Sequence, residues 1–225
     1  MSFSTGEETV WIAVVYDSGS QGRAELRGRT ATLAAEIAAG AGEVVGSTPR
    51  LICVADGGAA WDQLAGADAI VFGCPTYMGS GSAAFKSFME DSFVQAWREQ
   101  VWKDRLAGVF TNSAGRSGDK LAPLIQLAVF AAQHGMVIVS LGEMPGHITS
   151  DGGEHQVNRL SLVPGFDGQS NADQGPDATP PAARPPAGSG RGSRGRLTAG
   201  RLWGMTTGRW GAGNSLDRSG ASQCR

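Results

Sequence analysis

Three segments rich in glycine and hydroxyl side chains each follow an apolar run in the first part of the chain. They cover residues 17–30, 73–82 and 111–120. Glycine lets the backbone approach a planar ligand closely, and backbone N–H groups at the start of a helix bind anions such as phosphate. The segments therefore hold the residue types that a phosphate group and a flat polar ring require.

The first segment is a candidate phosphate site. It begins with Asp17, Ser18 and Gly19 and ends at Thr30, which is expected to cap the next helix. It has neither the G-x-x-x-x-G-K-S/T string of nucleotide-hydrolysing P-loops nor the G-x-G-x-x-G string. Glycine and serine are also common in turns of every kind, so an ordinary strand-to-helix loop is the alternative interpretation.

The second segment offers a surface for a planar ring. Pro75 is expected to end the preceding strand because it has no N–H group to donate. Thr76 and the backbone can hydrogen-bond a polar ring edge, Tyr77 and Met78 add apolar surface, and Gly79 permits close approach. The alternative is that Tyr77 and Met78 only plug the top of the core.

The third segment again combines small, polar and glycine residues, and its alternative is a flexible surface loop in which Asp119 caps the next helix. Taken alone, His134 is more typical of a histidine at a helix C-terminus, where the dipole favours it. Cys74 is interpreted as a small buried residue rather than a thiol catalyst. No Ser/His/Asp set or carboxylate pair converges in the sequence.

Alternating elements must position these segments. Short apolar runs predict five strands, at residues 10–16, 50–55, 69–74, 106–110 and 136–141, and amphipathic spacing predicts helices at 30–41, 82–99 and 121–134. This alternation predicts an α/β fold with a parallel sheet covered on both faces. In such sheets the ligand lies beyond the carboxyl ends of the strands, which is where the three segments fall.

Composition narrows the function classes. The chain has 225 residues and a formal net charge of −2, which gives no electrostatic reason to expect nucleic acid or an anionic membrane as a partner. Its three cysteines match no metal-site spacing, so no metal is expected. We find no signal-peptide pattern and no apolar run long enough to span a bilayer, and we expect a cytoplasmic protein.

In this order, the three segments resemble the flavodoxin-like NAD(P)H:quinone oxidoreductases of the Trp-repressor-binding-protein type and the flavodoxin-family FMN reductases close to them. The resemblance is carried by FGCPTYMG at 72–79, SAAFKSFM at 82–89, FTNS at 110–113 and QHGMVIV at 133–139. The corresponding family strings read approximately G-T-P-T-x-x-G, F-T-S-S and H-H-G-M-x-x-V. The resemblance covers residues 10–142 and implies a flavodoxin-like three-layer sandwich with strand order 2-1-3-4-5.

The resemblance also implies an FMN site. Residues that match the start and end of the family's phosphate loop are Ser18, Gly19, Arg29 and Thr30. Residues that match the loop along the flavin ring are Thr76, Tyr77, Met78 and Gly79. Residues that match the third flavin loop are Asn112, Ser113, Ala114, Gly115, Arg116 and Ser117.

Two further positions follow from the resemblance. His134 matches a histidine beside the flavin and the quinone, which makes it the candidate catalytic residue and a cofactor contact. Trp97 or Trp102 falls where the family has a tryptophan near the substrate pocket, and the sequence does not choose between them.

The resemblance implies an FMN-dependent enzyme that takes hydride from NADH or NADPH and reduces a quinone or similar acceptor, as a homodimer or homotetramer. The flavin would carry the electrons while the protein positions it. Two alternatives stay open. One is a flavodoxin-like electron carrier without quinone reductase activity of its own, and the other is a non-catalytic relative with impaired flavin binding.

Two departures from the family pattern bear on these alternatives. About eight residues between Ser18 and Thr30 have no counterpart in the family's first loop, which could reshape the phosphate site. We expect a flavodoxin-like domain over residues 1–165 and an irregular or disordered tail over 166–225, which is rich in Gly, Pro and Arg. Either a change of coding frame near Ala182 or a natural basic tail would explain that composition.

Overall fold

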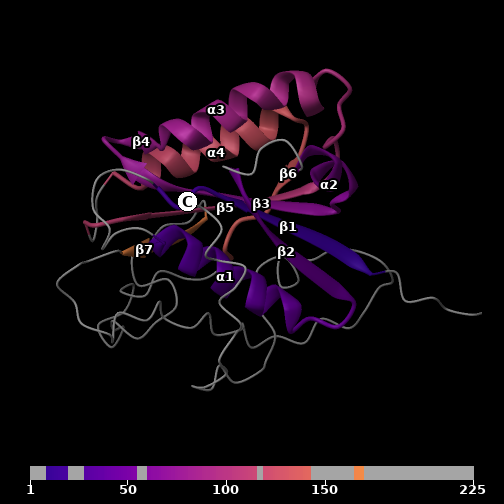
Figure 1. Ribbon diagram of the computed structural model, residues 1–225, viewed down its shortest axis with the longest axis horizontal. Helices are drawn as coiled ribbons and strands as arrows, with labels where there is room; N and C mark the ends of the chain where they lie inside the picture. The colour runs from indigo at the N-terminus through magenta and orange to yellow at the C-terminus, as the bar shows by residue number, and fades with distance from the viewer. Residues whose placement is uncertain (1–8, 20–27, 55–59, 116–118, 143–164, 170–225) are drawn as a thin grey trace, which may run out of the picture.

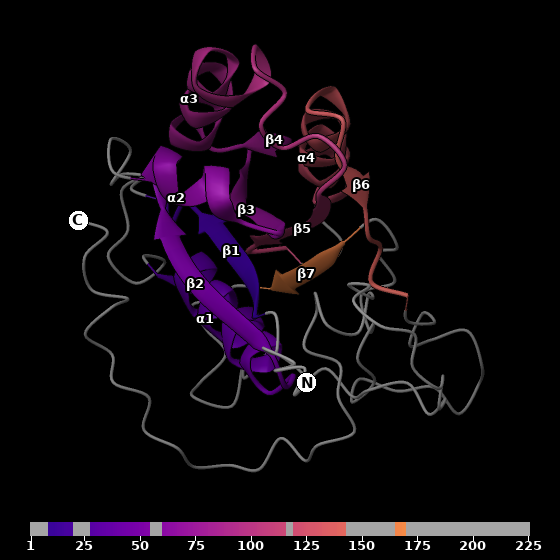
Figure 2. The same cartoon turned by 90° about the vertical axis from the view of Figure 1, so that its right-hand side faces the viewer.

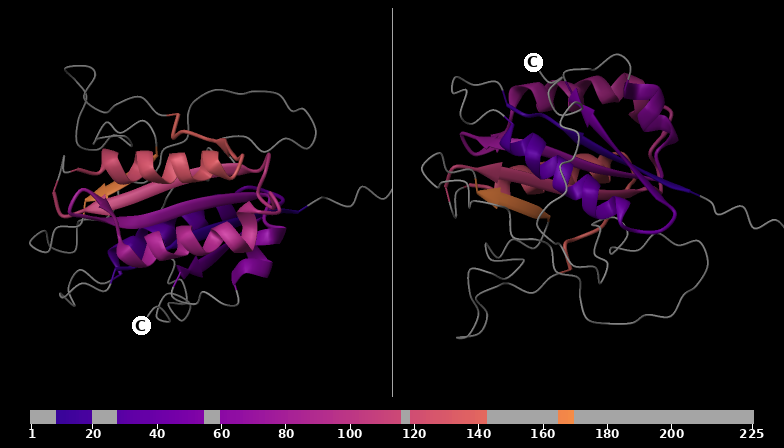
Figure 3. Two further views of the ribbon diagram at one scale, coloured as in Figure 1. Left: turned by 90° about the horizontal axis from the view of Figure 1, so that it is seen from above. Right: turned by 60° about the horizontal axis from the view of Figure 1, so that its bottom comes forward.

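A parallel sheet between two helical layers forms the folded part of the chain (Figure 1). The computed structural model describes residues 9–19, 28–54, 60–115, 119–142 and 165–169. One face of the sheet carries α1 (Arg29–Gly42), and the other carries α3 (Ala83–Ser92) and α4 (Leu121–Gln133), which lie side by side in Figure 3. The predicted three-layer α/β sandwich is confirmed.

The strands run in the order β2-β1-β3-β5-β6 and pair in parallel. Their bounds are β1 Val10–Tyr16, β2 Ser47–Cys53, β3 Ala69–Tyr77, β5 Leu106–Ser113 and β6 Val137–Ile138. Because β5 and β6 are the predicted fourth and fifth strands, the expected order 2-1-3-4-5 is confirmed. All three loops of interest therefore leave the sheet at its carboxyl edge.

Continuous apolar runs place β1 and β3 at the centre, where both faces are buried. Side chains that alternate along these strands feed two separate cores. Val15 and Phe72 pack toward α3 and α4 with Phe85 and Leu127. Val14 packs toward α1 in a second cluster, which is completed by Ile12, Val71, Leu33 and Ile37.

One prediction about β3 is wrong, because the strand continues through Pro75 to Tyr77. The carbonyl group of Gly73, two residues before Pro75, points toward β1 and accepts a hydrogen bond from the Asp17 N–H group. Pro75 faces the same side, but β1 pairs with β3 only as far as Gly73. The proline therefore removes no ladder hydrogen bond, and the strand can extend into the loop region.

Other element bounds also differ from prediction. The helix expected over 82–99 is α-helical only to Ser92 and continues as a π-helical turn, Phe93–Trp97. The strand expected over 50–55 lies at Ser47–Cys53, and the fifth strand is reduced to Val137–Ile138. A short helix, α2 (Ala60–Gly66), was not predicted.

The outer edge of β5 is shared by two strands. β6 pairs with its first residues, and β7 (Phe166–Gln169) pairs in parallel with Phe110–Ser113 at its last residues (Figure 2). β7 lies beyond the boundary expected at residue 165, so the sheet includes part of the predicted tail. The rest of that tail, residues 170–225, lies outside the described residues.

Candidate functional site

The three loops predicted to bind a ligand converge at the carboxyl edge of the sheet. The Asp17 N–H group donates to the Gly73 carbonyl at 3.1 Å, which holds the first loop against β3. The Thr76 and Thr111 hydroxyls lie 2.8 Å apart and join β3 to β5. Residues far apart in the sequence therefore form one surface, as parallel topology requires.

Gly19 and Tyr77 form the contact between the first and second loops. Gly19 has φ +73°, and its α-carbon lies so close to the Tyr77 hydroxyl that a Cβ would not fit. Its N–H group donates to Asp17 Oδ1 at 3.1 Å. Because glycine alone tolerates both the conformation and the contact, this residue fixes how the loops meet.

The N-terminus of α1 is open in the way an anion site requires. Gly28 precedes the helix with φ +93°, and among the described residues no side chain caps the helix. A Cβ on Gly28 would meet no atom of the described residues within 4 Å. Within the part of the chain that the structure describes, the N–H groups of the first turn are left for a ligand, and with the positive end of the helix dipole they fit a phosphate.

Thr30 connects that helix to the third loop. It is 1% exposed, and its hydroxyl donates to Asn112 Oδ1 at 2.6 Å. Arg29, beside it, is half-buried. The predicted end of the phosphate loop and the predicted third flavin loop are thus in direct contact.

The second loop presents a hydrogen-bond acceptor and exposed apolar surface. The Thr111 hydroxyl donates to the Cys74 carbonyl at 2.7 Å. It must then accept from Thr76, whose oxygen keeps its lone pairs for a ligand N–H. Met78, at φ +49°, is fully exposed, and Gly79 follows with φ +79°. A polar ring edge with an N–H donor fits this loop.

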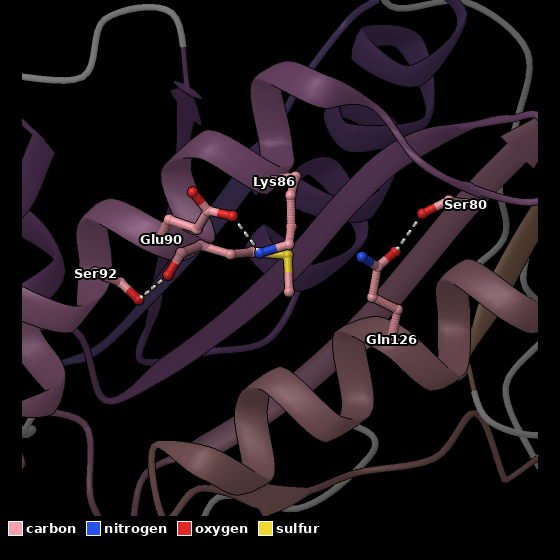
Figure 4. Close-up of polar contacts among 6 residues, drawn as sticks. Ser80, Lys86, Glu90, Ser92 and Gln126 are labelled. Carbon is pink, nitrogen blue, oxygen red and sulfur yellow. Dashed lines mark hydrogen bonds and ion pairs between the residues drawn. The ribbon is translucent and has the colours of Figure 1, made fainter.

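α4 supports the hairpin that follows this loop. Gln126 Oε1 accepts from the Ser80 hydroxyl at 3.1 Å (Figure 4). The same oxygen accepts from the Gly81 N–H group at 3.0 Å. Ser80 and Gly81 form β4 (Ser80–Gly81), which pairs antiparallel with the end of β3. Sequence reasoning missed Gln126 because it lies 45 residues from the loop that it holds.

The third loop is described in part. Asn112 and Ser113 are buried at the end of β5, and the Ser113 hydroxyl donates to the Gly115 carbonyl at 2.9 Å. Ala114 and Gly115 are exposed. Arg116 and Ser117, also predicted to contact the flavin, lie outside the described residues.

A buried carboxylate shapes the electrostatics of this edge. Asp17 is 7% exposed. Burial, together with the charge of Asp17, raises the pKa of Tyr77. Burial likewise raises the pKa of Cys74 to about 12, against a smaller lowering by a backbone hydrogen bond with Ser82 and with a still smaller increase from the charge of Asp17. Cys74 is therefore a protonated, buried thiol, as predicted.

His134 does not lie with these loops, contrary to expectation for a single chain. It caps the C-terminus of α4, where the Asp104 N–H group donates to the Gly135 carbonyl at 2.9 Å and Val137 pairs with Leu106. Leu106 is the first residue of β5, whereas the flavin loop follows its last residue. A strand of this length separates His134 from the three loops by roughly 20 Å.

His134 is held as a neutral side chain. The Ser92 hydroxyl donates its proton to the Met89 carbonyl at 2.7 Å, so it can only accept from His134 Nε2 at 3.0 Å. Nδ1 is therefore the unprotonated nitrogen, and it is buried without a partner among the described residues. Burial lowers the pKa of His134 to about 4.

The two candidate substrate tryptophans also lie at the amino edge. Trp102 is 1% exposed and packs on His134 with ring centroids 4.4 Å apart, so it is a core residue. Trp97 is 40% exposed, stacks on Phe93, and donates to the Gln133 carbonyl at 2.8 Å. Of the two, only Trp97 has a surface that a substrate could reach.

Within the described residues, no group of three or more His, Cys, Asp or Glu side chains is arranged to hold a metal ion. No helix there has both the length and the apolar character needed to cross a bilayer. The arrangement at the carboxyl edge, with an open helix N-terminus and a ring-sized surface beside Thr76 and Met78, fits FMN.

Comparison with known proteins agrees with this geometry. A crystal structure of a WrbA-like flavodoxin from Agrobacterium tumefaciens is 35% identical, with a TM-score of 0.51 over 72% of this chain and 83% of that one. Flavodoxin FldP of Pseudomonas aeruginosa is 43% identical over 122 residues, and a NAD(P)H dehydrogenase (quinone) of Geobacter sulfurreducens is 38% identical over 80 residues.

These matches cover 54% and 36% of this chain, and the chain spans 65% and 39% of the length of the two curated relatives. The family model for NADPH-dependent FMN reductase matches residues 21–147, which is more than half of the chain. The resemblance inferred from the sequence is thus confirmed, and the chain belongs to the NADPH-dependent FMN reductase family.

Proposed function

We propose that this protein is an FMN-dependent oxidoreductase that takes hydride from NADH or NADPH and reduces a quinone or similar acceptor. The observation that carries the proposal is the convergence of three predicted flavin loops at one edge of the sheet, in front of an uncapped helix N-terminus. Bound FMN would supply the chemistry, because its ring accepts a hydride and passes on two electrons.

The described residues would hold FMN in a defined orientation. The first turn of α1 would bind the phosphate, with Arg29 adding positive charge beside it. Thr76 would accept a hydrogen bond from the ring edge, and Tyr77 and Met78 would lie against the ring. In this proposal the hydride transfer does not require Cys74 or a pair of carboxylates to carry a proton.

We further propose a homodimer or homotetramer in which a neighbouring subunit completes the acceptor pocket. Trp97 lies at the amino edge of its own subunit and is 40% exposed, so it could reach flavin loops only on another chain, whereas His134, at the same edge, is 2% exposed and would act only through the residues that cover it. Apolar side chains near them are exposed, as an interface would require: Phe93, Val94, Val129, Val137 and Ile138. The predicted cytoplasmic location stays a prediction.

Support for a quinone acceptor comes from relatives named NAD(P)H dehydrogenase (quinone), including one from Methanosarcina mazei that is 35% identical over 80 residues. The second candidate is a flavodoxin-like electron carrier, which the similarity to flavodoxin FldP favours. The two candidates differ in one respect that can be measured. An oxidoreductase consumes NAD(P)H repeatedly when only a quinone is added, whereas a carrier requires a protein partner.

Absorbance spectra of the purified protein, before and after FMN is added, test the cofactor. Steady oxidation of NADH or NADPH at 340 nm with benzoquinone then tests the activity. We expect Tyr77→Asp to weaken FMN binding by more than tenfold, while Val45→Asp, at an exposed position in the turn between α1 and β2, leaves it unchanged. Protein that binds no FMN contradicts the proposal, and flavin-loaded protein that turns over only with a protein partner supports the carrier instead.

A further inference from the structure

Thr111 is a buried side chain to which the proposed function assigns no role. It lies on β5, opposite Cys74 of β3, and is 0% exposed. Its hydroxyl donates to the Cys74 carbonyl at 2.7 Å. Because a hydroxyl has only one proton, Thr111 can only accept from its second neighbour, the Thr76 hydroxyl at 2.8 Å. The direction of both hydrogen bonds is therefore fixed.

This arrangement leaves Thr76 as a group that accepts hydrogen bonds from a ligand but has no proton to offer it. The hydroxyl proton of Thr76 is directed at Thr111, and the lone pairs of its oxygen remain for a ligand. A free hydroxyl would rotate its proton to suit whichever ligand atom lies nearby. Thr76 cannot do so without breaking a buried hydrogen bond, which costs free energy.

The backbone of Thr76 is held in place as well as its hydroxyl. Pairing of β3 with β5 ends at Pro75, one residue earlier, so the hydroxyl contact joins the two strands beyond that point. Thr76 also pairs with Gly81 of β4, whose N–H group donates to Gln126 at 3.0 Å. Threonine is β-branched, which restricts its side chain to few rotamers. The acceptor is therefore presented at a defined place in the predicted flavin loop.

The oxidised and reduced forms of a flavin ring differ in the hydrogen-bonding groups at the ring edge. In the oxidised ring, N1, N5 and the two carbonyl oxygens are acceptors, and N3–H is the only donor. Hydride transfer from NADH or NADPH breaks a C–H bond of the nicotinamide and forms an N–H bond at flavin N5. Both electrons of the broken bond go to the ring, and NAD(P)⁺ is left. Reduction therefore adds a donor to the ring edge and removes none.

We propose that Thr111 is a positioning residue that keeps the Thr76 hydroxyl as a pure acceptor facing flavin N5, so that the site favours the reduced ring over the oxidised ring. This inference rests on the proposed function. The acceptor gains a hydrogen bond when N5 carries a proton, whereas it meets a second acceptor when the ring is oxidised. A hydrogen bond made in only one of the two states changes their relative affinity by roughly tenfold.

The test is the midpoint potential of FMN bound to the full-length protein, measured by stepwise reduction against a reference dye. Thr111→Val keeps the shape of the side chain but removes its hydroxyl, which frees the Thr76 proton to turn toward the ring. Thr111→Ser keeps the hydroxyl and should retain the wild-type potential. The matched control is Thr48→Val, the same substitution on β2 near the amino edge of the sheet.

Thr76→Val provides a second variant if Thr111→Val folds poorly by circular dichroism. It removes the acceptor itself, and it leaves no donor of Thr111 unpaired because that hydroxyl keeps the Cys74 carbonyl. We expect both valine variants to lower the ratio of reduced to oxidised FMN affinity about tenfold, which lowers the midpoint potential of this two-electron couple by about 30 mV. Thr111→Ser and Thr48→Val should change the ratio less than twofold.

A valine variant at Thr111 that binds both redox states more weakly by the same factor leaves the potential unchanged. That result overturns this inference, because Thr111 would then only stabilise the loop, and a potential that rises overturns it as well. In both cases the proposed function stands, since the protein still binds FMN. Wild-type protein that binds no FMN contradicts the proposed function, and this inference fails with it.

Discussion

The Thr30 hydroxyl donates to Asn112 Oδ1 at 2.6 Å across 82 residues of sequence, and both side chains are buried. This bond fixes the start of α1 against the end of β5. One buried hydrogen bond therefore holds the proposed phosphate-binding end of the FMN site against the loop proposed to contact the flavin ring. Leaving either of its polar groups without a partner in this buried position would cost free energy.

Replacing Thr30 with valine should lower the free energy of unfolding by about 1–3 kcal/mol, because the shape is kept while Asn112 loses a buried partner. Urea unfolding followed by circular dichroism measures the change. Thr32→Val is the matched control: its hydroxyl donates to the Gly28 carbonyl at 2.9 Å on the exposed side of the same helix. A loss as large in the control would mean that valine weakens the helix itself.

The strands and their order could be predicted from sequence because buried parallel strands are continuous apolar runs. The Val10–Tyr16 and Ala69–Tyr77 strands both contain such a run, and the alternation with helices leaves few topologies. α2 has only two turns, and β7 gains its order from pairing with a strand more than 50 residues earlier. The residues immediately around α2 and β7 therefore do not predict either element.

The sequence predicted which loops form the candidate site, but not the hydrogen bonds that hold these loops in place. Gly19 and Thr76 belong to strings that mark a ligand site, whereas the bonds made by Asp17 and Gln126 depend on distant residues. The place of His134 could have been foreseen. A helix of 13 residues spans about 20 Å and returns the chain to the amino edge, away from the flavin loops.

Gly19→Ala should disconnect the first loop from the second and weaken flavin binding by at least tenfold. The new methyl group would collide with the Tyr77 hydroxyl, and φ +73° is itself unfavourable for alanine by about 1–2 kcal/mol. Flavin fluorescence quenching measures the affinity. Adding Tyr77→Phe removes the colliding oxygen and should recover part of the loss; a double variant no better than Gly19→Ala would rule out the steric explanation.

Cys74 should resist alkylation in the folded protein. Its pKa is raised to about 12, so the reactive thiolate at pH 8 is roughly a thousandfold scarcer than for an ordinary cysteine, and burial also blocks access. Mass spectrometry after iodoacetamide treatment measures the rate, with the protein in urea as the reference. Rapid labelling of folded protein would contradict this assignment. Cys74→Ala should bind flavin normally, since the thiol is not part of the proposed chemistry.

His134 should make stability depend on pH below neutrality. Its pKa in the folded protein is about 4, against 6.5 for an ordinary histidine, because burial disfavours the charged imidazolium. Between pH 6.5 and pH 4 the unfolded chain binds a proton that the folded protein excludes. The free energy of unfolding should therefore fall as the pH drops through this window, by at most about 1.4 kcal/mol per pH unit from this group.

Urea unfolding between pH 4.5 and 7.5 measures that slope, and His134→Phe provides the comparison. Phenylalanine can pack against Trp102 and Phe130, which surround the imidazole, but it binds no proton. The variant should lose stability at pH 7.5, yet its dependence on pH below 6.5 should be shallower than that of the wild type. Equal slopes would mean that the imidazole titrates freely in the folded protein. Nδ1 would then need an acceptor in the folded protein, since a protonated His134 donates from both ring nitrogens.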